Sequence, residues 1–321
     1  MRATQVMAPG EIQIVEVPKP SMKPGHALIR TKQVSLCGSD FHVIYHSEPN
    51  AYPLPPGMSG HEVVGVVEEI DDPSSSLAVG DVTLTLVRGN QGMTEYSLVP
   101  VRDLLPLTGA KPTEHLLQAQ QLGTVLYAAK YLPTNVVSKR VAVIGQGSAG
   151  LWWNFVMRRL GARQVIGIDL QGHRLAISKH YGATHALHNA DVDTLAAIYD
   201  LTNGELPDIV IEAAGEAETI CMAVDLVKKD GTILYFGVPR LTTLDYPFFE
   251  LFRKTALVRT IVGTLADQNH ECTRMALDLI TRGDADVGPM ITHHFPFDQV
   301  IDAFELQATR DEGAIKIVVD M

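Results

Sequence analysis

The sequence has few cysteines, no long apolar run and a deficit of positive charge, and each shortage excludes a class of protein. Three cysteines, Cys37, Cys221 and Cys272, are too few and too scattered among 321 residues for a disulfide framework, which favours a reducing compartment. No segment approaches the roughly 18 uninterrupted apolar residues of a membrane span, and residues 1–20 lack the apolar core of a signal peptide. We therefore expect a cytoplasmic protein with no membrane partner.

The net charge of −11 argues against nucleic acid as the main partner, because nucleic-acid sites need clustered positive charge. The rest of the composition, 46% apolar and 20% charged, is ordinary for a globular protein, and 321 residues are enough for two domains. A small molecule is the expected partner.

Hydrophobic patterning divides the chain into three segments. Residues 1–110 contain short alternating apolar runs between Pro and Gly turns, which is typical of antiparallel strands. Residues 111–287 begin with a helical stretch from Thr113 to about Tyr131, and apolar strands then alternate with helical patterns. This alternation predicts an α/β fold with a doubly wound parallel sheet. Residues 288–321 are expected to return to the first domain.

A glycine turn lies at the start of the α/β segment. The turn, Gly145-Gln146-Gly147-Ser148-Ala149-Gly150, follows an apolar strand at 141–144 and opens a helical pattern. Glycines allow the backbone to bend and to approach a pyrophosphate, which the free N–H groups of the helix then bind. Asp169 closes the next strand nineteen residues after Gly150. This context predicts a dinucleotide-binding (Rossmann) unit rather than a plain glycine turn.

Asp169 favours NAD over NADP, because its carboxylate can accept hydrogen bonds from the ribose hydroxyls and would repel a 2′-phosphate. The alternative is that Asp169 only caps the following helix. Arg174 lies five residues further on. It either contributes to the predicted cofactor site or is an exposed charge that faces water.

The first domain carries a thiol and an imidazole at Cys37 and His61, with Asp40, His42 and Glu62 beside them in sequence. Thiolate and imidazole are ligand types that zinc prefers, and a catalytic zinc takes three protein ligands. From spacing alone, Cys37 could equally be a buried apolar residue and His61 a structural one.

Together these motifs resemble those of the zinc-dependent, medium-chain alcohol/polyol dehydrogenases. The sorbitol dehydrogenase-like branch is the most similar, through Cys37-Gly38-Ser39-Asp40. The resemblance extends over nearly the whole chain. Besides the glycine turn, five motifs carry it: Cys37-Gly38-Ser39-Asp40, Gly60-His61-Glu62, Val79-Gly80-Asp81-Val82, Gly92-Met93-Thr94-Glu95-Tyr96 and Gly313-Ala314-Ile315-Lys316-Ile317. It implies a partly open β-barrel (GroES-like) catalytic domain and oxidation of a secondary alcohol on a polyol, cyclitol or sugar-like substrate, with NAD and one catalytic zinc per subunit.

Carried over to this sequence, the resemblance implies that Cys37 and His61 bind zinc, that Glu62 lies next to the metal, and that Asp40 orients His61. Ser39 would take a proton from the alcohol and pass it toward His42. Backbone groups at Gly237, Val238 and Gly263 would hold the nicotinamide.

The sequence departs from the family pattern at two places. The lobe of four cysteines that holds a structural zinc is missing near residues 88–95, so we expect no structural zinc. Gln120 also stands where the family commonly has an anionic ligand. We therefore predict a metal site of Cys37, His61 and Glu62, with Gln120 at most hydrogen-bonded to bound water.

Two other functions stay open at this point: a zinc-free quinone or enoyl reductase, and a non-catalytic dinucleotide-binding protein. We also expect a homodimer or homotetramer, because the apolar strand at 256–262 would otherwise leave a sheet edge unpaired.

Overall fold

The computed structural model describes residues 1–190, 192–261, 263 and 266–321, and these form two compact units. The first contains residues 1–123 and 264–321, and the second contains residues 124–263. These divisions, after residues 123 and 263, differ from the predicted boundaries at 110 and 287. The reason is that a short helix, α2 (Thr113–Leu117), packs on strands of the first unit and on helix α9 (Glu271–Arg282). Among the described residues, no helix has the length and apolar character needed to cross a bilayer.

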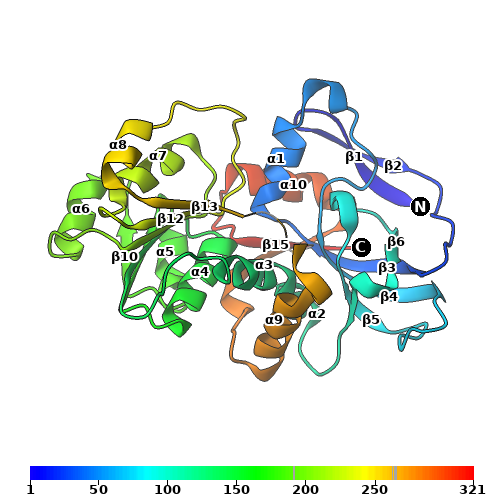
Figure 1. Cartoon of the computed structure of the whole chain (residues 1–321). Coiled ribbons are helices and arrows are strands. Elements are labelled where there is room, and N and C mark those ends of the chain that lie inside the picture. The colour runs from blue at the N-terminus through cyan, green and yellow to red at the C-terminus, as the bar shows by residue number, and fades with distance from the viewer. Residues whose placement is uncertain (191, 262, 264–265) are drawn as a thin grey trace. The chain divides into compact units, whose positions relative to one another are not determined.

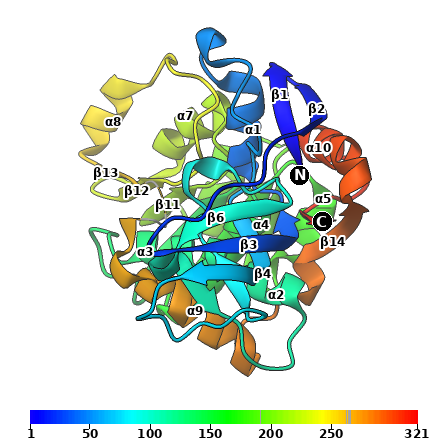
Figure 2. The same ribbon diagram turned by 90° about the vertical axis from the view of Figure 1, so that its right-hand side faces the viewer.

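The first unit is built on a mixed, mainly antiparallel sheet. Its order is β14-β15-β3-β4-β5-β7, and β6 pairs with β3 on the edge opposite β4. Figure 2 shows β6, β3 and β4 side by side in that order. A separate hairpin pairs β1 with β2. The bounds are β1 (Arg2–Ala8), β2 (Glu11–Glu16), β3 (His26–Ser35), β4 (Glu62–Asp71), β5 (Val82–Thr85), β6 (Tyr96–Pro100), β7 (Leu104–Pro106), β14 (Ile291–Pro296) and β15 (Lys316–Asp320).

The two ends of the chain meet in this sheet, because β15 pairs antiparallel with β3. Helices α1 (Gly38–His46) and α10 (Val300–Thr309) belong to the same unit, and α10 packs on β14 and β15. The apolar core between these elements includes Val34, Val63, Phe304 and Ile317. This core fixes the ends of β3 and β4, where the predicted metal ligands lie.

The second unit is a six-stranded parallel sheet in the order β10-β9-β8-β11-β12-β13. Helices lie on both faces, with α4 and α5 on one side and α7 and α8 on the other (Figure 1). The strands are β8 (Arg140–Ile144), β9 (Gln164–Asp169), β10 (His185–His188), β11 (Ile209–Glu212), β12 (Thr232–Tyr235) and β13 (Leu257–Thr260). The helices are α3 (Ala119–Ala129), which begins in the first unit, α4 (Ser148–Arg159), α5 (Gly172–Ser178), α6 (Thr194–Leu201), α7 (Ala217–Leu226) and α8 (Phe248–Lys254). The predicted doubly wound sheet is confirmed.

Local details differ from the sequence patterns. The helical stretch expected from residue 113 to 131 is two helices, and Gln118 is the C-cap of the first. The strand β10 was not predicted, because its four residues alternate between half-buried and exposed and none is fully buried. The expected edge strand at 256–262 is β13, and residue 262 lies outside the described residues.

We expect Asp208 to contribute a pH-dependent part of the stability of the second unit. This buried carboxylate accepts a hydrogen bond from the Arg140 N–H at 2.8 Å and pairs with Lys228. Burial alone would raise the pKa of Asp208, but Lys228 and the Arg140 N–H outweigh it, so the pKa is lowered. A lowered pKa stabilises the fold above the ordinary value of about 4, and this stability is lost as the pH falls through the folded value.

Asp208→Asn should therefore reduce the free energy of unfolding by about 2 kcal/mol at pH 7 and by much less at pH 3. Urea unfolding can be followed by the fluorescence of Trp152 and Trp153, which are both fully buried in this unit. An equal loss at both pH values would contradict the prediction.

Candidate metal and dinucleotide sites

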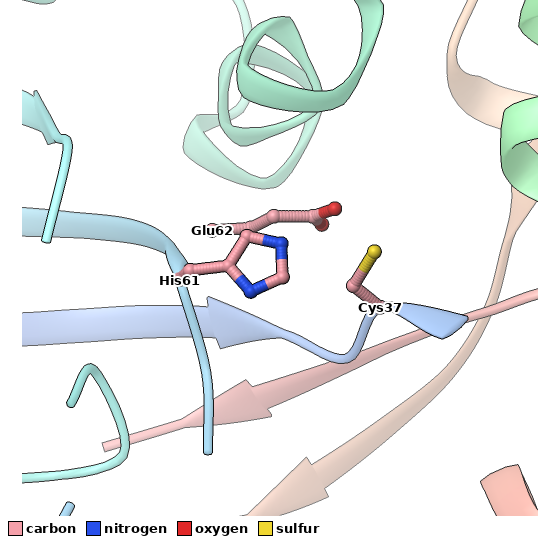
Figure 3. Close-up of side chains that lie close together, drawn as sticks. All are labelled: Cys37, His61 and Glu62. Carbon is pink, nitrogen blue, oxygen red and sulfur yellow. The ribbon is translucent and has the colours of Figure 1, made fainter. Parts of the chain in front are cut away.

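Cys37, His61 and Glu62 come together in the first unit. One ligand atom from each lies within 4.8 Å of the other two, and among the described residues no other group of His, Cys, Asp and Glu side chains does this. Figure 3 shows the Glu62 carboxylate and the His61 ring pointing toward the Cys37 sulfur. Cys37 lies two residues after the end of β3, His61 immediately precedes β4, and Glu62 is the first residue of β4. The pairing of these two strands therefore brings the three residues together.

The backbone around these residues explains their local sequence. Gly60 has φ +118, and a side chain on Gly92 would lie 2.7 Å from the Gly60 carbonyl oxygen, so both glycines are needed for this turn. Asp40, which is fully buried in the first turn of α1, accepts the Cys37 N–H at 2.8 Å. Its other oxygen lies 3.4 Å from His61 Nδ1. Asp40 therefore touches the two residues at once.

The charge state of His61 depends on these neighbours. Burial alone would lower the pKa of His61, but Asp40 and Cys37 outweigh it and raise the pKa well above its ordinary value. The protein thus favours a positive charge at this position, and a bound cation would interact with the same two side chains.

Glu62 is held by a residue from the far end of the chain. Lys316 Nζ lies 2.6 Å from Glu62 Oε2, and both side chains are fully buried. Ser35 donates a hydrogen bond to the same oxygen, and Lys316 also donates to the Leu36 carbonyl at 3.1 Å. Glu62 Oε1 is buried with no hydrogen-bond partner among the described residues. One oxygen of Glu62 is therefore engaged and the other is left for a cation.

Two glutamines that the sequence reasoning missed lie beside this group. Gln121 Nε2 donates to Cys37 Sγ at 3.6 Å, and Gln118 Nε2 donates to Ser35 Oγ at 3.2 Å. Their side-chain oxygens are buried without a hydrogen bond among the described residues. Buried acceptors left without donors, beside a thiol, an imidazole and a carboxylate, fit a zinc ion.

The predicted proton-transfer residues lie on α1. Ser39 is in its first turn and His42 follows three residues later, so the two side chains share one helix face. Both are partly exposed, and His42 Nδ1 has no hydrogen-bond partner among the described residues.

The glycine turn of the second unit has the backbone that the sequence predicts. It connects β8 to α4, which begins at Ser148 and contains Ala149 in its first turn. Gly145 has φ +88, and a side chain on Gly150 would lie 1.8 Å from the Gly145 carbonyl oxygen. Gly147 is the N-cap of α4. Such a turn at a helix N-terminus fits the pyrophosphate of a dinucleotide.

Asp169 lies beside this turn at the end of β9. Its two oxygens accept hydrogen bonds from the Gln146 N–H at 2.6 Å and the Gln171 N–H at 2.8 Å. A side chain on Gly147 would come within 3.9 Å of Arg174 Nη1, so Arg174 also reaches the turn. Asp169 thus orders both loops next to the position predicted for the adenosine ribose.

The remaining predicted cofactor residues lie at the carboxyl ends of β12 and β13. Gly237 donates a backbone hydrogen bond to the Glu212 carbonyl at 3.0 Å, and Val238 is 39% exposed. Gly263 has φ +83, and its neighbours 262 and 264 lie outside the described residues.

Comparisons with known proteins agree with both sites. Residues 23–109 match the alcohol dehydrogenase GroES-like domain, and residues 150–282 match the zinc-binding dehydrogenase domain. The chain belongs to the zinc-binding, medium-chain alcohol dehydrogenase family. It is therefore an oxidoreductase of the zinc- and NAD(P)-dependent alcohol dehydrogenase class.

Relatives of this dehydrogenase match over nearly its full length. It is 25% identical to an alcohol dehydrogenase of Cupriavidus necator, over 99% of this chain and 98% of the relative. It is 26% identical to an L-threonine 3-dehydrogenase of Pyrococcus horikoshii, over 95% and 94% of the two chains. The 2R,3R-butanediol dehydrogenase of Bacillus subtilis has the same fold, with a TM-score of 0.82 at 20% identity over 100% of this chain and 99% of that one.

Proposed function

We propose that this dehydrogenase oxidises a secondary alcohol, on a polyol, cyclitol or sugar-like substrate, reversibly to a ketone. The observation that carries the proposal is the convergence of Cys37, His61 and Glu62. A zinc ion there supplies a Lewis acid that makes an alcohol hydroxyl more acidic, and NAD supplies the hydride acceptor. The single catalytic zinc, and the absence of a structural one, remain predictions.

In this proposal the residues of the chain hold the ion and move a proton. Cys37, His61 and Glu62 are the three protein ligands, and Asp40 keeps the His61 ring in its ligating orientation. Ser39 would accept the proton of the substrate hydroxyl while it donates its own hydroxyl proton toward His42 by way of the cofactor ribose, and His42 would pass a proton on to solvent.

An NAD-coupled screen of polyols, cyclitols and amino sugars, read by NADH absorbance, tests this function on protein of measured zinc content. We expect turnover of at least one of these substrate classes at one zinc per chain. Activity on quinones or activated alkenes in protein without zinc would instead show a reductase. Tight NADH binding with no turnover on any panel would show a binding protein.

We expect NAD to be preferred over NADP because of Asp169. Asp169→Ser removes a carboxylate that lies between two loop N–H groups, and it should weaken NAD binding by about 1–3 kcal/mol. The loss for NADP should be smaller, because the repulsion of its 2′-phosphate disappears as well. The ratio of kcat/KM for the two cofactors measures this, and equal efficiency of the parent enzyme with both would refute it.

We also propose that the enzyme is a homodimer or homotetramer that pairs through β13. This strand forms one end of the parallel sheet, and its residues Leu257 and Val258 are exposed. Phe248, Phe249 and Phe252 on α8, the preceding helix, are also exposed. An apolar sheet edge of this kind invites pairing with a second copy. Sedimentation should give at least twice the mass of one chain, and Val258→Lys should lower it. A parent mass of a single chain at micromolar concentration would contradict the proposal.

A further inference from the structure

A buried carboxyl group in the second unit has no part in the function proposed so far. Glu212 is the last residue of β11, and its side chain is fully buried. In the parallel sheet β11 lies between β8 and β12, and Glu212 is level with Ile144 and Tyr235 of those strands. The chain runs from β8 to β9 on one side and reaches β11 on the other, so Glu212 lies at the point where the strand order reverses. In open parallel sheets ligands bind beyond the carboxyl ends of the strands at this point.

One oxygen of Glu212 organises the loop that follows it. Oε1 accepts hydrogen bonds from the Ala214 N–H, the Gly215 N–H and the Thr219 hydroxyl, each at 2.8 Å. Burial raises the pKa of Glu212, and these three donors offset only part of that effect. The carboxyl group therefore stays buried because it accepts hydrogen bonds from two loop N–H groups and from the Thr219 hydroxyl, which also lies 2.9 Å from the Glu216 carbonyl oxygen.

The loop fixed in this way lies against the glycine turn on one side. Ala213 N–H donates to the Ile144 carbonyl at 2.8 Å. A side chain on Gly145 would lie 3.1 Å from the backbone nitrogen of Ala214. The position of residues 213–215 thus limits the position of the turn predicted to hold the pyrophosphate.

The same loop lies against residues 237–240 on its other side. A side chain on Gly215 would lie 2.2 Å from the Val238 carbonyl oxygen, and one on Gly237 would lie 2.4 Å from the Gly215 nitrogen. The Arg240 N–H donates to the Gly215 carbonyl at 3.1 Å, and Arg240 Nε lies 2.9 Å from Glu216 Oε1. Residues 213–215 are therefore packed between the two predicted halves of the cofactor site.

We propose that Glu212 is a positioning residue for the dinucleotide, whose carboxyl oxygen fixes residues 213–215 between the Gly145 turn and the Gly237–Val238 loop. This rests on the proposed use of a dinucleotide. The chemistry needed from Glu212 is a single acceptor oxygen rather than a charge. Glutamine supplies such an oxygen in the same place, whereas alanine leaves the Ala214 and Gly215 N–H groups without this acceptor.

Titration of the purified full-length chain with NADH, followed by nucleotide fluorescence, tests the proposal. Glu212→Ala should raise the dissociation constant for NADH about tenfold or more, and Glu212→Gln should stay within about threefold of the parent. Zinc content should be the same in all three proteins. The matched control is Glu218→Gln, which removes an exposed carboxylate from α7 and should change nothing.

Thr219 provides a second, milder test if Glu212→Ala does not fold. Thr219→Val removes one of the three donors and should weaken NADH binding severalfold, whereas Thr219→Ser should bind as the parent does. Parent-like NADH binding by Glu212→Ala, or by Thr219→Val where the alanine variant is unfolded, would overturn the positioning role. A tenfold loss in Glu212→Gln would also overturn it, because a charge would then be required. Failure of the parent itself to bind NADH would instead overturn the proposed function.

Discussion

Alanine in place of Cys37 should remove tightly bound zinc and lower kcat/KM for alcohol oxidation at least about a thousandfold, which corresponds to about 4 kcal/mol of lost transition-state stabilisation. Cys37 supplies the only thiol of the three converging residues. Without it, His61 and Glu62 remain, and two ligands are too few to retain zinc against a chelator. Metal analysis after dialysis, together with the NAD-coupled assay, measures both effects.

Cys221→Ala is the matched control for this experiment. Cys221 lies on α7 in the second unit, where its thiol donates to the Asp245 carbonyl at 3.3 Å. Its removal should leave zinc content and activity unchanged, and Cys37→Ala should still bind NADH. Retention of zinc by Cys37→Ala, or equal zinc loss in both variants, would exclude Cys37 as a ligand. The same dialysis tests the third ligand, because Glu62→Gln should lose more zinc than Gln120→Ala.

The second large effect is expected at Lys316. Lys316→Met removes the cation that lies 2.6 Å from Glu62 in a fully buried pair. Breaking such a pair leaves an uncompensated buried charge and costs about 3–5 kcal/mol. Because β15 pairs with β3, the loss should be seen as faster hydrogen exchange of β15 and β3 amides in zinc-free protein. Zinc should restore part of the protection, since the ion gives Glu62 another positive neighbour.

A double variant separates the charge from the packing. Lys316→Met combined with Glu62→Gln removes both charges, and it should recover most of the stability that the single variant loses in zinc-free protein. If the double variant is no more stable than Lys316→Met, or if Lys316→Met alone loses less than about 1 kcal/mol, the ion pair does not have this role.

The dinucleotide turn could be predicted from the sequence because its parts are local. The strand, the three glycines, the helix start and Asp169 all lie within residues 140–169, and each has a separate backbone requirement. The sequence also predicted the alternation of strands and helices that forms the parallel sheet. Cys37, His61 and Glu62 were identified through motif resemblance, and the pairing of β3 with β4 brings them together.

The choice among the glutamines could not be made from the sequence. Gln120 stood out by its place in the family pattern, yet Gln118 and Gln121 make the hydrogen bonds to Ser35 and Cys37. The helix breaks at Gln118, between α2 and α3, and no local pattern in the sequence marks Gln118 and Gln121 as the side chains that reach Ser35 and Cys37.

The sequence by itself determined the fold class, the glycine turn and the types of ligand available for zinc, because these depend on periodicity, on backbone freedom and on side-chain chemistry. Only the tertiary structure decided which residues surround those ligands. Lys316 is 254 positions from Glu62 (316 − 62) and reaches it because β15 pairs with β3. Glu212 gains its position from the order of the parallel strands. Pairing between strands far apart in sequence follows from the burial of a shared core, and no local pattern encodes it.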